Sequence, residues 1–498
     1  MIMPEQSNTT KVLKGVSAQT LITILIGVIE IVAFSIMSRL LSQQDFGYYA
    51  AVTAVSTIFA SFADAGIGSA IVQRKVLDQK YIDNAFTLCL LYGLFGSLLL
   101  VACSGPAARY VADETMQVPL MLVAITLLTN TIASVNFSIM HRKLQFLRMG
   151  IIRISALIIT TVVSIILAIK GFGYYAIIAK VILYSIITLI VSHFAAHTKY
   201  HISFDLKAFK EIFGFGGWLQ ASVFFRKIAD QVDRLMMSSL FSVATLGMYS
   251  RPKEFINSMT GRLTDIFDSS LFPVLSSIQD ENERLVSSYK SALYYLNIAG
   301  LMVTLVFMFN SELIIRIFLG AEWMNVNTLF IVLSFSGIMM TNGSLGDIFL
   351  RSLAFTKQQF FLRILQAVVS ILLIYLSARL GVVAVAFAYL LAYGLVVFVK
   401  MWFISRKINY RLRNSLRVIL MSYKVALFYL PTYVLCMCIM PNTILWNIVK
   451  ALIFGMMTII VFLISPVCVG QEYKDNLYKT VVSFITSKIS FLQVNKKN

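Results

Sequence analysis

Ionisable side chains collect on one face of a segment that is otherwise apolar enough to cross a membrane. They stand at positions i, i+4, i+7 and i+8, which share one side of an α-helix, and are Arg226, Asp230, Asp233 and Arg234. Guanidinium groups bind phosphate or carboxylate through paired hydrogen bonds. This face therefore suits a charged headgroup, although the four side chains could also satisfy one another as i,i+4 ion pairs.

A second such face follows in the next apolar segment. Its members stand at i, i+3, i+7, i+11 and i+14 and are Arg251, Glu254, Ser258, Arg262 and Asp265. One ionised side chain at the bilayer centre costs about 2.5–3.5 kcal/mol, so four that face lipid would cost on the order of 10 kcal/mol. We therefore expect both faces to line a hydrated cavity or to pair inside the bundle. Arg251, Arg262 and Asp265 join the first four residues as candidates for a substrate cavity.

Single ionisable residues also interrupt other apolar segments. Arg153 and Lys180 are further candidates for the substrate cavity. Glu30, Asp64 and Asp347 are candidates for binding a coupling ion, because an intramembrane carboxylate is a functional-site hypothesis by default. The same residues could equally form ion pairs that hold helices together. When the other ionisable residues of these segments are included, the formal charges cancel, so the sequence does not predict a plainly cationic cavity.

The overall composition explains why charges in these places matter. Of 498 residues, 58% are hydrophobic and 13% are charged, whereas a soluble domain has roughly 25% charged residues. The apolar residues occur in runs of about 20, the length needed to span a hydrocarbon core of ~30 Å. This pattern predicts an all-α, polytopic membrane protein and excludes a soluble or disordered chain. The net charge of +19 does not indicate nucleic-acid binding, because the basic residues are dispersed between apolar runs.

About 14 apolar segments are candidate transmembrane helices. They are 16–38, 46–70, 84–104, 116–139, 150–169, 173–195, 214–240, 245–273, 290–310, 325–350, 360–378, 381–403, 421–440 and 443–468. With the N-terminus inside, about 27 Lys and Arg residues fall on the inner side and about 5 on the outer side. Cytoplasmic loops carry such an excess, so we expect both termini to be cytoplasmic. The first run lacks a small-residue cleavage site, so we interpret it as a retained helix.

Two internal matches suggest a duplication. Residues 40–50 (LLSQQDFGYYA) align with residues 240–250 (LFSVATLGMYS), and residues 153–176 match residues 363–386 at a similar offset. Six helices in each half would make the two repeats parallel, related by an axis along the membrane normal. We therefore predict four parts: an N-terminal lobe (1–198), an amphipathic linker helix (199–213), a C-terminal lobe (214–404), and two extra helices with a cytoplasmic tail (405–498).

Motifs that would indicate an enzyme or a metalloprotein are weak. Residues 171–176 (GFGYYA) match a dinucleotide-binding pattern but lie in a turn between two membrane segments, with no preceding strand. His193, His197 and His201 are spaced by four residues, which could present imidazoles along one helix face for a metal. No acidic or Cys partner is obvious, so we interpret them as titratable residues at a membrane interface. The cysteines form no paired metal motif, and the sequence has no P-loop and no nucleophile elbow. We therefore expect no catalytic residue, no metal and no cofactor.

Residues 38–75 resemble the first helical hairpin of the bacterial polysaccharide transporter family. The residues that match its turn and its Gly-rich segment are Ser38, Arg39, Leu41, Ser42, Asp45, Phe46 and Gly47, then Asp64, Gly66, Gly68, Ala70 and Gln73. The second hairpin is similar at 233–235 and 246–251, and residues 272–276 resemble its end. The resemblance covers about residues 10–470. It implies the two-lobed architecture of the multidrug/oligosaccharidyl-lipid/polysaccharide exporter superfamily.

The resemblance also implies a function. It suggests a Wzx-type flippase that moves undecaprenyl-diphosphate-linked oligosaccharide units across the bacterial cytoplasmic (inner) membrane by alternating access, for the synthesis of O-antigen, capsule or exopolysaccharide. The implied partners are the lipid-linked oligosaccharide, membrane lipid, a polysaccharide polymerase and chain-length proteins, with no nucleic acid. A drug or cation antiporter of the same architecture stays open as an alternative. A membrane polysaccharide polymerase is a weaker one, because the outer loops are short.

Overall fold

The computed structural model describes residues 5–63, 67–74, 77–111, 113–205 and 217–424, together with residues 449, 453 and 456. Within this part of the chain the secondary structure is helical, and nine segments are long and apolar enough to cross a membrane. They are Ile22–Leu40, Gln79–Tyr110, Glu114–Arg142, Phe146–Ile169, Tyr175–Ala196, Asn282–Phe309, Ala321–Ser352, Thr356–Leu380 and Val382–Lys407. The chain is therefore an all-α polytopic membrane protein. The last two predicted spans, 421–440 and 443–468, lie almost wholly outside the described residues.

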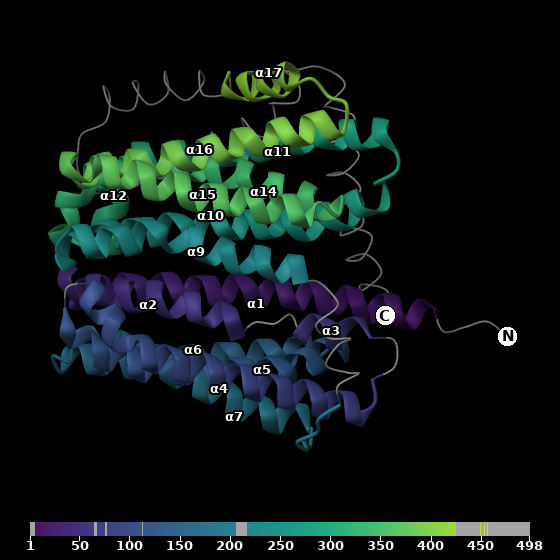
Figure 1. Cartoon of the computed structure of the whole chain (residues 1–498), viewed down its shortest axis with the longest axis vertical. Helices are drawn as coiled ribbons and strands as arrows, with labels where there is room; N and C mark the ends of the chain where they lie inside the picture. The colour runs from purple at the N-terminus through teal and green to yellow at the C-terminus, as the bar shows by residue number, and fades with distance from the viewer. Residues whose placement is uncertain are drawn as a thin grey trace. The chain divides into compact units, whose positions relative to one another are not determined.

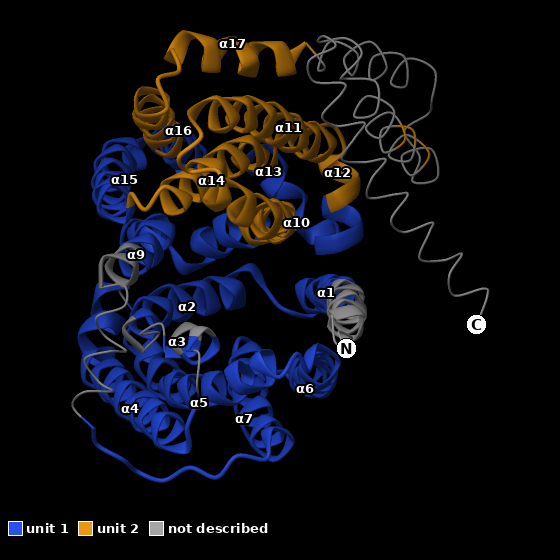
Figure 2. Cartoon of the chain, turned by 90° about the vertical axis from the view of Figure 1, so that its right-hand side faces the viewer, with its two compact units in different colours: residues 1–252, 315–329, 356–392 blue, residues 253–314, 330–355, 393–498 orange. Residues whose placement is uncertain are grey.

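Contacts between helices divide the chain into two compact units (Figure 2). Unit 1 contains Met1–Pro252, Ile315–Leu329 and Thr356–Ala392. Unit 2 contains Lys253–Ile314, Phe330–Phe355 and Tyr393–Asn498. The division into two six-helix lobes stays a prediction, because contact density groups helices by their packing and not by their place in a repeat.

Helices α1 to α7 form the N-terminal bundle of unit 1. Their bounds are α1 Glu5–Leu40, α2 Gln43–Ala63, α3 Ile67–Gln73, α4 Gln79–Tyr110, α5 Gln117–Arg142, α6 Phe146–Ile169 and α7 Tyr175–Ala196, with a short 3-10 helix, η1, at Glu114–Met116. α5 packs against α4 and α7, while α6 packs against α1 and α7. Figures 1 and 2 show α4 to α7 lying side by side. The predicted single span 46–70 is described as two helices, α2 and α3, on either side of residues 64–66.

Unit 1 continues with helices from later in the chain. These are α9 Gly217–Leu240, the first residues of α10 Val243–Ser277, the π-helical η2 Ile315–Leu319, the 3-10 helix η3 Ala321–Val326, the start of α13 Asn327–Ser334, α15 Thr356–Ser377, the 3-10 helix η4 Ala378–Leu380 and the start of α16 Val382–Lys407. α9 packs against α2 and α15. The helices α9 and α10 confirm that the seventh and eighth predicted spans are helical. Neither is apolar enough to count among the nine membrane spans of the described chain.

Unit 2 is built around α11, Asn282–Phe309. Its other helices are the remainder of α10, α12 Ser311–Ile314, the end of α13, α14 Ser336–Ser352, most of α16 and α17 Leu412–Tyr423. α11 packs against α14 and α17. Asn297 on α11 links these helices, because its amide donates to the Ser422 hydroxyl and its carbonyl oxygen accepts from Asn342 Nδ2 at 2.8 Å.

The N-terminal bundle exposes large apolar side chains and buries several polar ones. Leu98 and Ile169 are 60% and 68% exposed, whereas Asn84 and Thr160 are 0% exposed. The buried Thr160 hydroxyl donates to the carbonyl of Ala156 on its own helix, at 2.8 Å. Small and hydroxylated side chains let membrane helices approach closely, while lipid contacts the large apolar ones. Large apolar side chains therefore cover the outer surface, and buried polar residues share the interior with an apolar cluster that includes Ile71, Leu88 and Val135.

The matched sequences at residues 40–50 and 240–250 form matched turns. The helices that enter the turns, α1 and α9, end at Leu40 and Leu240, and the helices that leave them, α2 and α10, begin at Gln43 and Val243. In both turns a serine hydroxyl, Ser42 or Ser242, accepts the backbone N–H of the residue three positions later, at 3.2 and 3.3 Å. The same break and the same capping bond therefore recur at one offset, which agrees with the predicted duplication.

The two turns also meet one another at a pair of glycines. A Cβ atom on Gly47 would lie 1.8 Å from the carbonyl oxygen of Val243, and a Cβ atom on Gly247 would lie 1.8 Å from that of Gln43. Residues 43 and 243 are equivalent in the repeat, as are residues 47 and 247. α2 and α10 therefore make the same contact from both sides, with a local twofold axis between them. Only glycine allows two backbones to come this close.

The predicted linker helix 199–213 is wrong over its described part. Residues 198–205, which we call the strap, are not helical, and Figure 2 shows them running from the end of α7 toward α4. Their backbone N–H groups at residues 201, 203 and 205 donate to Asp83, Thr87 and Asn84 of α4, at 3.1, 3.0 and 2.9 Å. These side chains take up the donors that a helix would have satisfied internally. Residues 206–213 lie outside the described residues.

Candidate functional site

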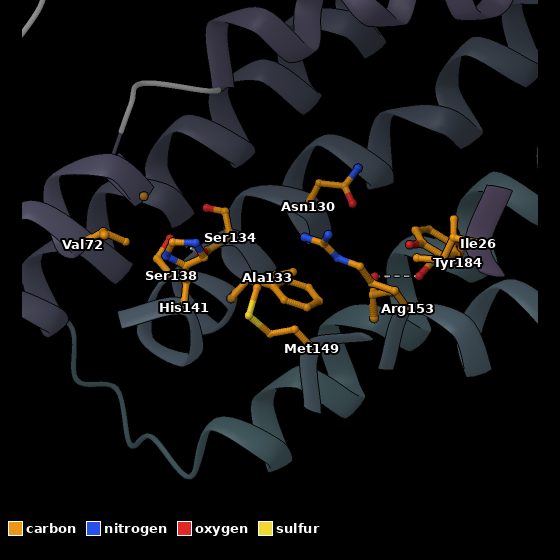
Figure 3. A pocket seen from close by; sticks show the side chains of 13 residues that line it. Ile26, Val72, Asn130, Ala133, Ser134, Ser138, His141, Met149, Arg153 and Tyr184 are labelled. Carbon is orange, nitrogen blue, oxygen red and sulfur yellow. Dashed lines mark hydrogen bonds between the residues drawn. The ribbon is translucent and has the colours of Figure 1, made fainter. Parts of the chain in front are cut away.

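A cavity of about 800 Å³ lies inside the N-terminal bundle of unit 1. We call it the α5 cavity, because α5 supplies six of its 13 lining residues, more than α1, α3, α6 or α7. Its lining residues are Ile26, Gly68, Val72, Asn130, Ala133, Ser134, Phe137, Ser138, His141, Met149, Arg153, Tyr184 and Thr188 (Figure 3). Much of the wall is apolar, with polar groups spaced along it. A cavity of this size and lining is typical of a ligand site.

The polar wall of the α5 cavity comes from a single face of α5. Asn130, Ser134, Ser138 and His141 line it and stand at i, i+4, i+8 and i+11, which is one side of a helix. The sequence analysis missed this stripe, because it searched apolar segments for charges and these side chains are uncharged or titratable. A search for uncharged polar residues at helical spacing within an apolar span would have found it.

Arg153 provides the formal positive charge of the α5 cavity. It projects from α6, and Figure 3 shows its guanidinium directed into the cavity near Asn130. The guanidinium carbon lies 5.0 Å from the centroid of the Phe137 ring. This cation–π distance holds the group in place without neutralising its charge. Of the residues that the sequence predicted to line a substrate cavity, Arg153 is the one that lines this cavity in the described structure.

Two other predicted residues lie near Arg153. Glu30 stands one turn from Ile26 on α1, and Lys180 stands one turn from Tyr184 on α7. Both Ile26 and Tyr184 line the α5 cavity. Arg153 and Glu30 both act electrostatically on the Tyr184 side chain. Arg153 and Glu30, which are isolated in the sequence, thus both act on a side chain of the cavity wall, whereas Lys180 is placed only by its position one turn from that wall.

The charged face predicted on α9 is divided between different surroundings. Arg226 and Asp230 are exposed, and Arg234 is half-buried with its guanidinium 3.4 Å from the side-chain oxygen of Gln231. Asp233 is 1% exposed and accepts the Tyr249 hydroxyl at 2.6 Å. None of these four side chains is among the residues that line the α5 cavity. The spacing is helical as predicted, but the residues do not share one environment.

Arg251 sits in a packed contact and not in the α5 cavity. It is 5% exposed, and its guanidinium carbon lies 3.3 and 4.1 Å from the ring centroids of Phe34 and Phe46. Its nitrogens donate to Ser38 Oγ at 3.0 Å and to the Phe34 carbonyl at 2.9 Å. Hydrogen bonds and aromatic faces together satisfy the buried charge. The contact joins α10 to the end of α1, near the glycine crossing, the name we give to the contact of α2 and α10 at Gly47 and Gly247.

The remaining predicted residues lie in unit 2 or outside the described chain. Arg262 is half-buried and Asp265 is exposed. Asp347 accepts an ion pair from Lys400 Nζ at 2.9 Å, and this lysine side chain is 2% exposed. Asp64 lies outside the described residues. Asp347 is thus held in a buried ion pair, whereas Glu30 lies close to a cavity.

The chain is similar to proteins of surface polysaccharide synthesis. Residues 36–328 match the model of a family described as polysaccharide biosynthesis protein. The putative O-antigen transporter of Shigella flexneri is 25% identical over 315 residues, covering 59% of this chain and 73% of that protein. Teichuronic acid biosynthesis protein TuaB of Bacillus subtilis is 21% identical over 357 residues, covering 68% and 71%. Lipopolysaccharide biosynthesis protein WzxC of Escherichia coli is 18% identical over 336 residues, covering 67% and 68%.

Solved structures show the same helical architecture. The lipid II flippase MurJ in an inward closed conformation matches with a TM-score of 0.66 at 15% identity, over 93% of this chain and 99% of that one. An inward-facing multidrug resistance transporter of the MATE family matches with a TM-score of 0.63 at 15% identity, over 78% and 94%. At these identities the likeness establishes the fold alone. It supports the all-helical, polytopic fold.

Proposed function

The chain belongs to the polysaccharide biosynthesis protein family, and on that premise we propose that it is a flippase for undecaprenyl-diphosphate-linked oligosaccharide units. It moves each unit across the bacterial inner membrane for the synthesis of surface polysaccharide. The names of similar proteins support this function, since they include an O-antigen transporter and a succinoglycan biosynthesis transport protein. Each unit crosses because its headgroup binds on one side of the membrane and is released on the other.

The observation that carries the proposal is the placement of Arg153 in the α5 cavity. A diphosphate headgroup needs donors that replace its water shell, and a guanidinium supplies two parallel ones. Asn130, Ser134 and Ser138 supply donors and acceptors suited to sugar hydroxyls. The polyprenyl tail stays in lipid. The cavity thus lowers the free-energy cost of moving a polar head through an apolar layer. No covalent bond has to form or break for this.

The charge of the α5 cavity favours this substrate over a cationic drug. Among the described residues, its lining includes the positive Arg153 and no carboxylate. Summed over the predicted segments the charges cancel, but the fold separates them, placing the carboxylates of Asp233 and Asp347 in contacts elsewhere. An antiporter that exports cations would bring a carboxylate to its cavity wall, as Coulomb attraction requires. The anionic headgroup is therefore the better match.

Glu30 is the best placed residue for coupling to a proton. It lies one turn from the cavity wall on α1 and shares the Tyr184 side chain with Arg153. Protonation of this carboxylate would strengthen the positive field around Arg153, and so would favour headgroup binding. We propose that this change accompanies alternation of the cavity between the two faces of the membrane, with both termini in the cytoplasm and the two lobes moving as units.

Deletion of the gene tests the function, and complementation tests the cavity. The deletion strain should lose surface polysaccharide and accumulate a lipid-linked oligosaccharide on the inner leaflet. Arg153→Gln removes a charge-assisted interaction worth about 1.5–3 kcal/mol, so export should fall roughly 10- to 100-fold at equal membrane level. Lys170→Gln, at the exposed end of the same helix, should restore export fully.

Two results would count against the proposal in different ways. Unchanged surface polysaccharide in the deletion strain, without any accumulated lipid-linked intermediate, would refute the flippase function. Normal export by Arg153→Gln would leave the function standing but would remove Arg153 from headgroup binding. Glu30→Gln extends the test, because a coupling role predicts that export by this variant no longer responds to the proton gradient.

A further inference from the structure

A second cavity, of about 820 Å³, lies at the other side of the same bundle. We call it the strap pocket, because the strap forms one wall and α4 and α7 form the others. Its lining residues are Phe86, Leu189, Ile190, His193, Phe194, Thr198, Lys199, Tyr200 and His201. On α7 these residues follow a different face from Tyr184 and Thr188, which line the α5 cavity. The strap pocket is therefore separate from the site proposed for transport.

The strap pocket has an apolar side and a polar side. Ile190 and Phe194 of α7 are 49% and 71% exposed, on the outer surface of a helix apolar enough to span the membrane. On the strap, Lys199 provides an ammonium, while the Thr198 hydroxyl donates to Tyr200 and the His201 ring lies 3.6 Å from the Asp83 carboxylate. One ligand that reaches both sides must carry a hydrocarbon chain and a polar group that accepts hydrogen bonds.

The polar side of the pocket is held in place before any ligand arrives. The Tyr200 ring stacks on Phe86, with centroids 4.5 Å apart and the planes 2° from parallel. The Tyr200 hydroxyl donates to Asn136 and accepts from Thr198 Oγ1 at 2.7 Å. Burial is the main cause that raises the pKa of Tyr200, so this hydroxyl keeps its proton. The carbonyl of Lys199 accepts from Gln79 Nε2 at 2.8 Å, which fixes the backbone that carries the ammonium.

The carboxylates near the strap are already occupied. Asp83 accepts from Gln79 Nε2 at 2.8 Å and from the His201 backbone N–H at 3.1 Å, and Asp205 pairs with Lys80 at 2.8 Å. The Lys80 ammonium offsets the charge of Asp205, while the neutral donors hold the Asp83 carboxylate in place. Neither described carboxylate forms an ion pair with the exposed Lys199 ammonium on the pocket wall, which can therefore attract an anion.

We propose that the strap pocket binds one anionic glycerophospholipid, with its phosphate at Lys199 and an acyl chain along Ile190 and Phe194. Basic pockets between membrane helices on the cytoplasmic side are suited to such headgroups, and the predicted orientation places the strap on that side. The single ammonium matches the single negative charge of a phosphodiester such as phosphatidylglycerol. The lipid fills the gap between α4 and α7 and braces the strap against the bundle.

Lipid retention measured by native mass spectrometry tests this proposal. The purified full chain is exchanged from nanodiscs of equal phosphatidylglycerol and phosphatidylcholine content, and the lipid that stays bound is quantified. The wild type should retain phosphatidylglycerol in excess. Lys199→Gln should retain about fivefold less, the loss expected when one cation leaves an anionic surface. Lys143→Gln, an exposed lysine at the end of α5, should match the wild type.

A competition arm identifies the source of the phosphate. Undecaprenyl diphosphate added at the concentration of phosphatidylglycerol should not displace it from the strap pocket. Equal retention of the two phospholipids, unchanged retention by Lys199→Gln, or displacement by undecaprenyl diphosphate would each overturn the proposal. The test is independent of the transport proposal, since Arg153→Gln should keep the bound phospholipid whether or not it exports oligosaccharide.

Discussion

The glycine crossing of α2 and α10 allows a prediction whose size follows from one distance. A methyl group at Gly47 would stand 1.8 Å from the carbonyl oxygen of Val243, while ordinary contact begins near 3.4 Å. In Gly47→Ala the two helices must therefore separate by about 1.6 Å, or tilt by an equivalent amount. The obstacle is backbone, so no side chain can rotate out of the way.

Separation of the helices also disturbs the packing around the crossing. Phe46 and Leu246 are 2% and 0% exposed beside it, so they lose contacts when α2 and α10 move apart. Overpacking a dense interior costs typically 1–3 kcal/mol. We expect Gly47→Ala and Gly247→Ala to lie near the upper end, at about 3 kcal/mol each. One displacement accommodates both methyl groups, so the double variant should cost clearly less than the sum of the single variants.

Thermal inactivation of the purified protein in detergent measures this effect. Unfolding of a large membrane protein is treated as a rate, so half-lives at one temperature are compared. Gly261→Ala on α10 is the matched control, because a Cβ atom there would meet no atom within 4 Å. Alanine in a helix is favoured over glycine by about 0.5–1 kcal/mol, so the control should inactivate no faster than the wild type. If Gly47→Ala survives as long as Gly261→Ala, the crossing does not require glycine and the local twofold contact is misjudged.

Other perturbations test the charges. Lys400→Met removes the buried ammonium that pairs with the half-buried Asp347 carboxylate and should cost up to about 3–5 kcal/mol, whereas the double variant with Asp347→Leu should recover most of that stability in the same assay. Burial raises the pKa of the Asp113 carboxyl group, but hydrogen bonds from Thr115 and a tyrosine outweigh this effect and hold the pKa below its usual 3.8. The ionised carboxylate therefore stabilises the fold above pH 3.8, and this contribution is lost as the pH falls through the lowered pKa. The difference in half-life between the wild type and Asp113→Asn should vanish at low pH. Arg226 is exposed and is not among the residues that line the α5 cavity, so Arg226→Ala should keep export near the wild-type level at equal membrane level, and a clear loss of export would indicate a second headgroup contact on α9.

The fold was largely predictable from hydropathy and spacing. A membrane span must present an apolar surface along its whole length, so α4 to α7 stand out in any window of suitable size. The repeated turn was also readable, because Ser42 and Ser242 cap the following helices by local hydrogen bonds. The predicted linker helix failed for a non-local reason. Its amphipathic spacing favours a helix, but α4 offers side-chain acceptors that a sequence window does not contain.

The site was only partly predictable. Charges inside apolar segments pointed to Arg153 and Glu30, because the cost of placing them in lipid demands a special environment. The same argument selected Arg251 and Asp347, which the fold satisfies with aromatic rings, hydroxyls and a lysine. Desolvation cost says that a charge needs a partner, but it does not say whether the partner is a protein group or a ligand.

By itself, the sequence determined that this chain crosses the membrane many times, repeats a hairpin, and must shelter its ionisable residues from lipid. Those properties depend on the solvation of each segment and on hydrogen bonds between residues close in sequence, so a short stretch of sequence is enough to predict them. The tertiary structure alone decided which charges meet the wall of a cavity, which are sealed in packed contacts, and where two glycines let the repeats touch. These outcomes depend on which faces of distant helices pack together, and the free energy of that packing belongs to the whole bundle.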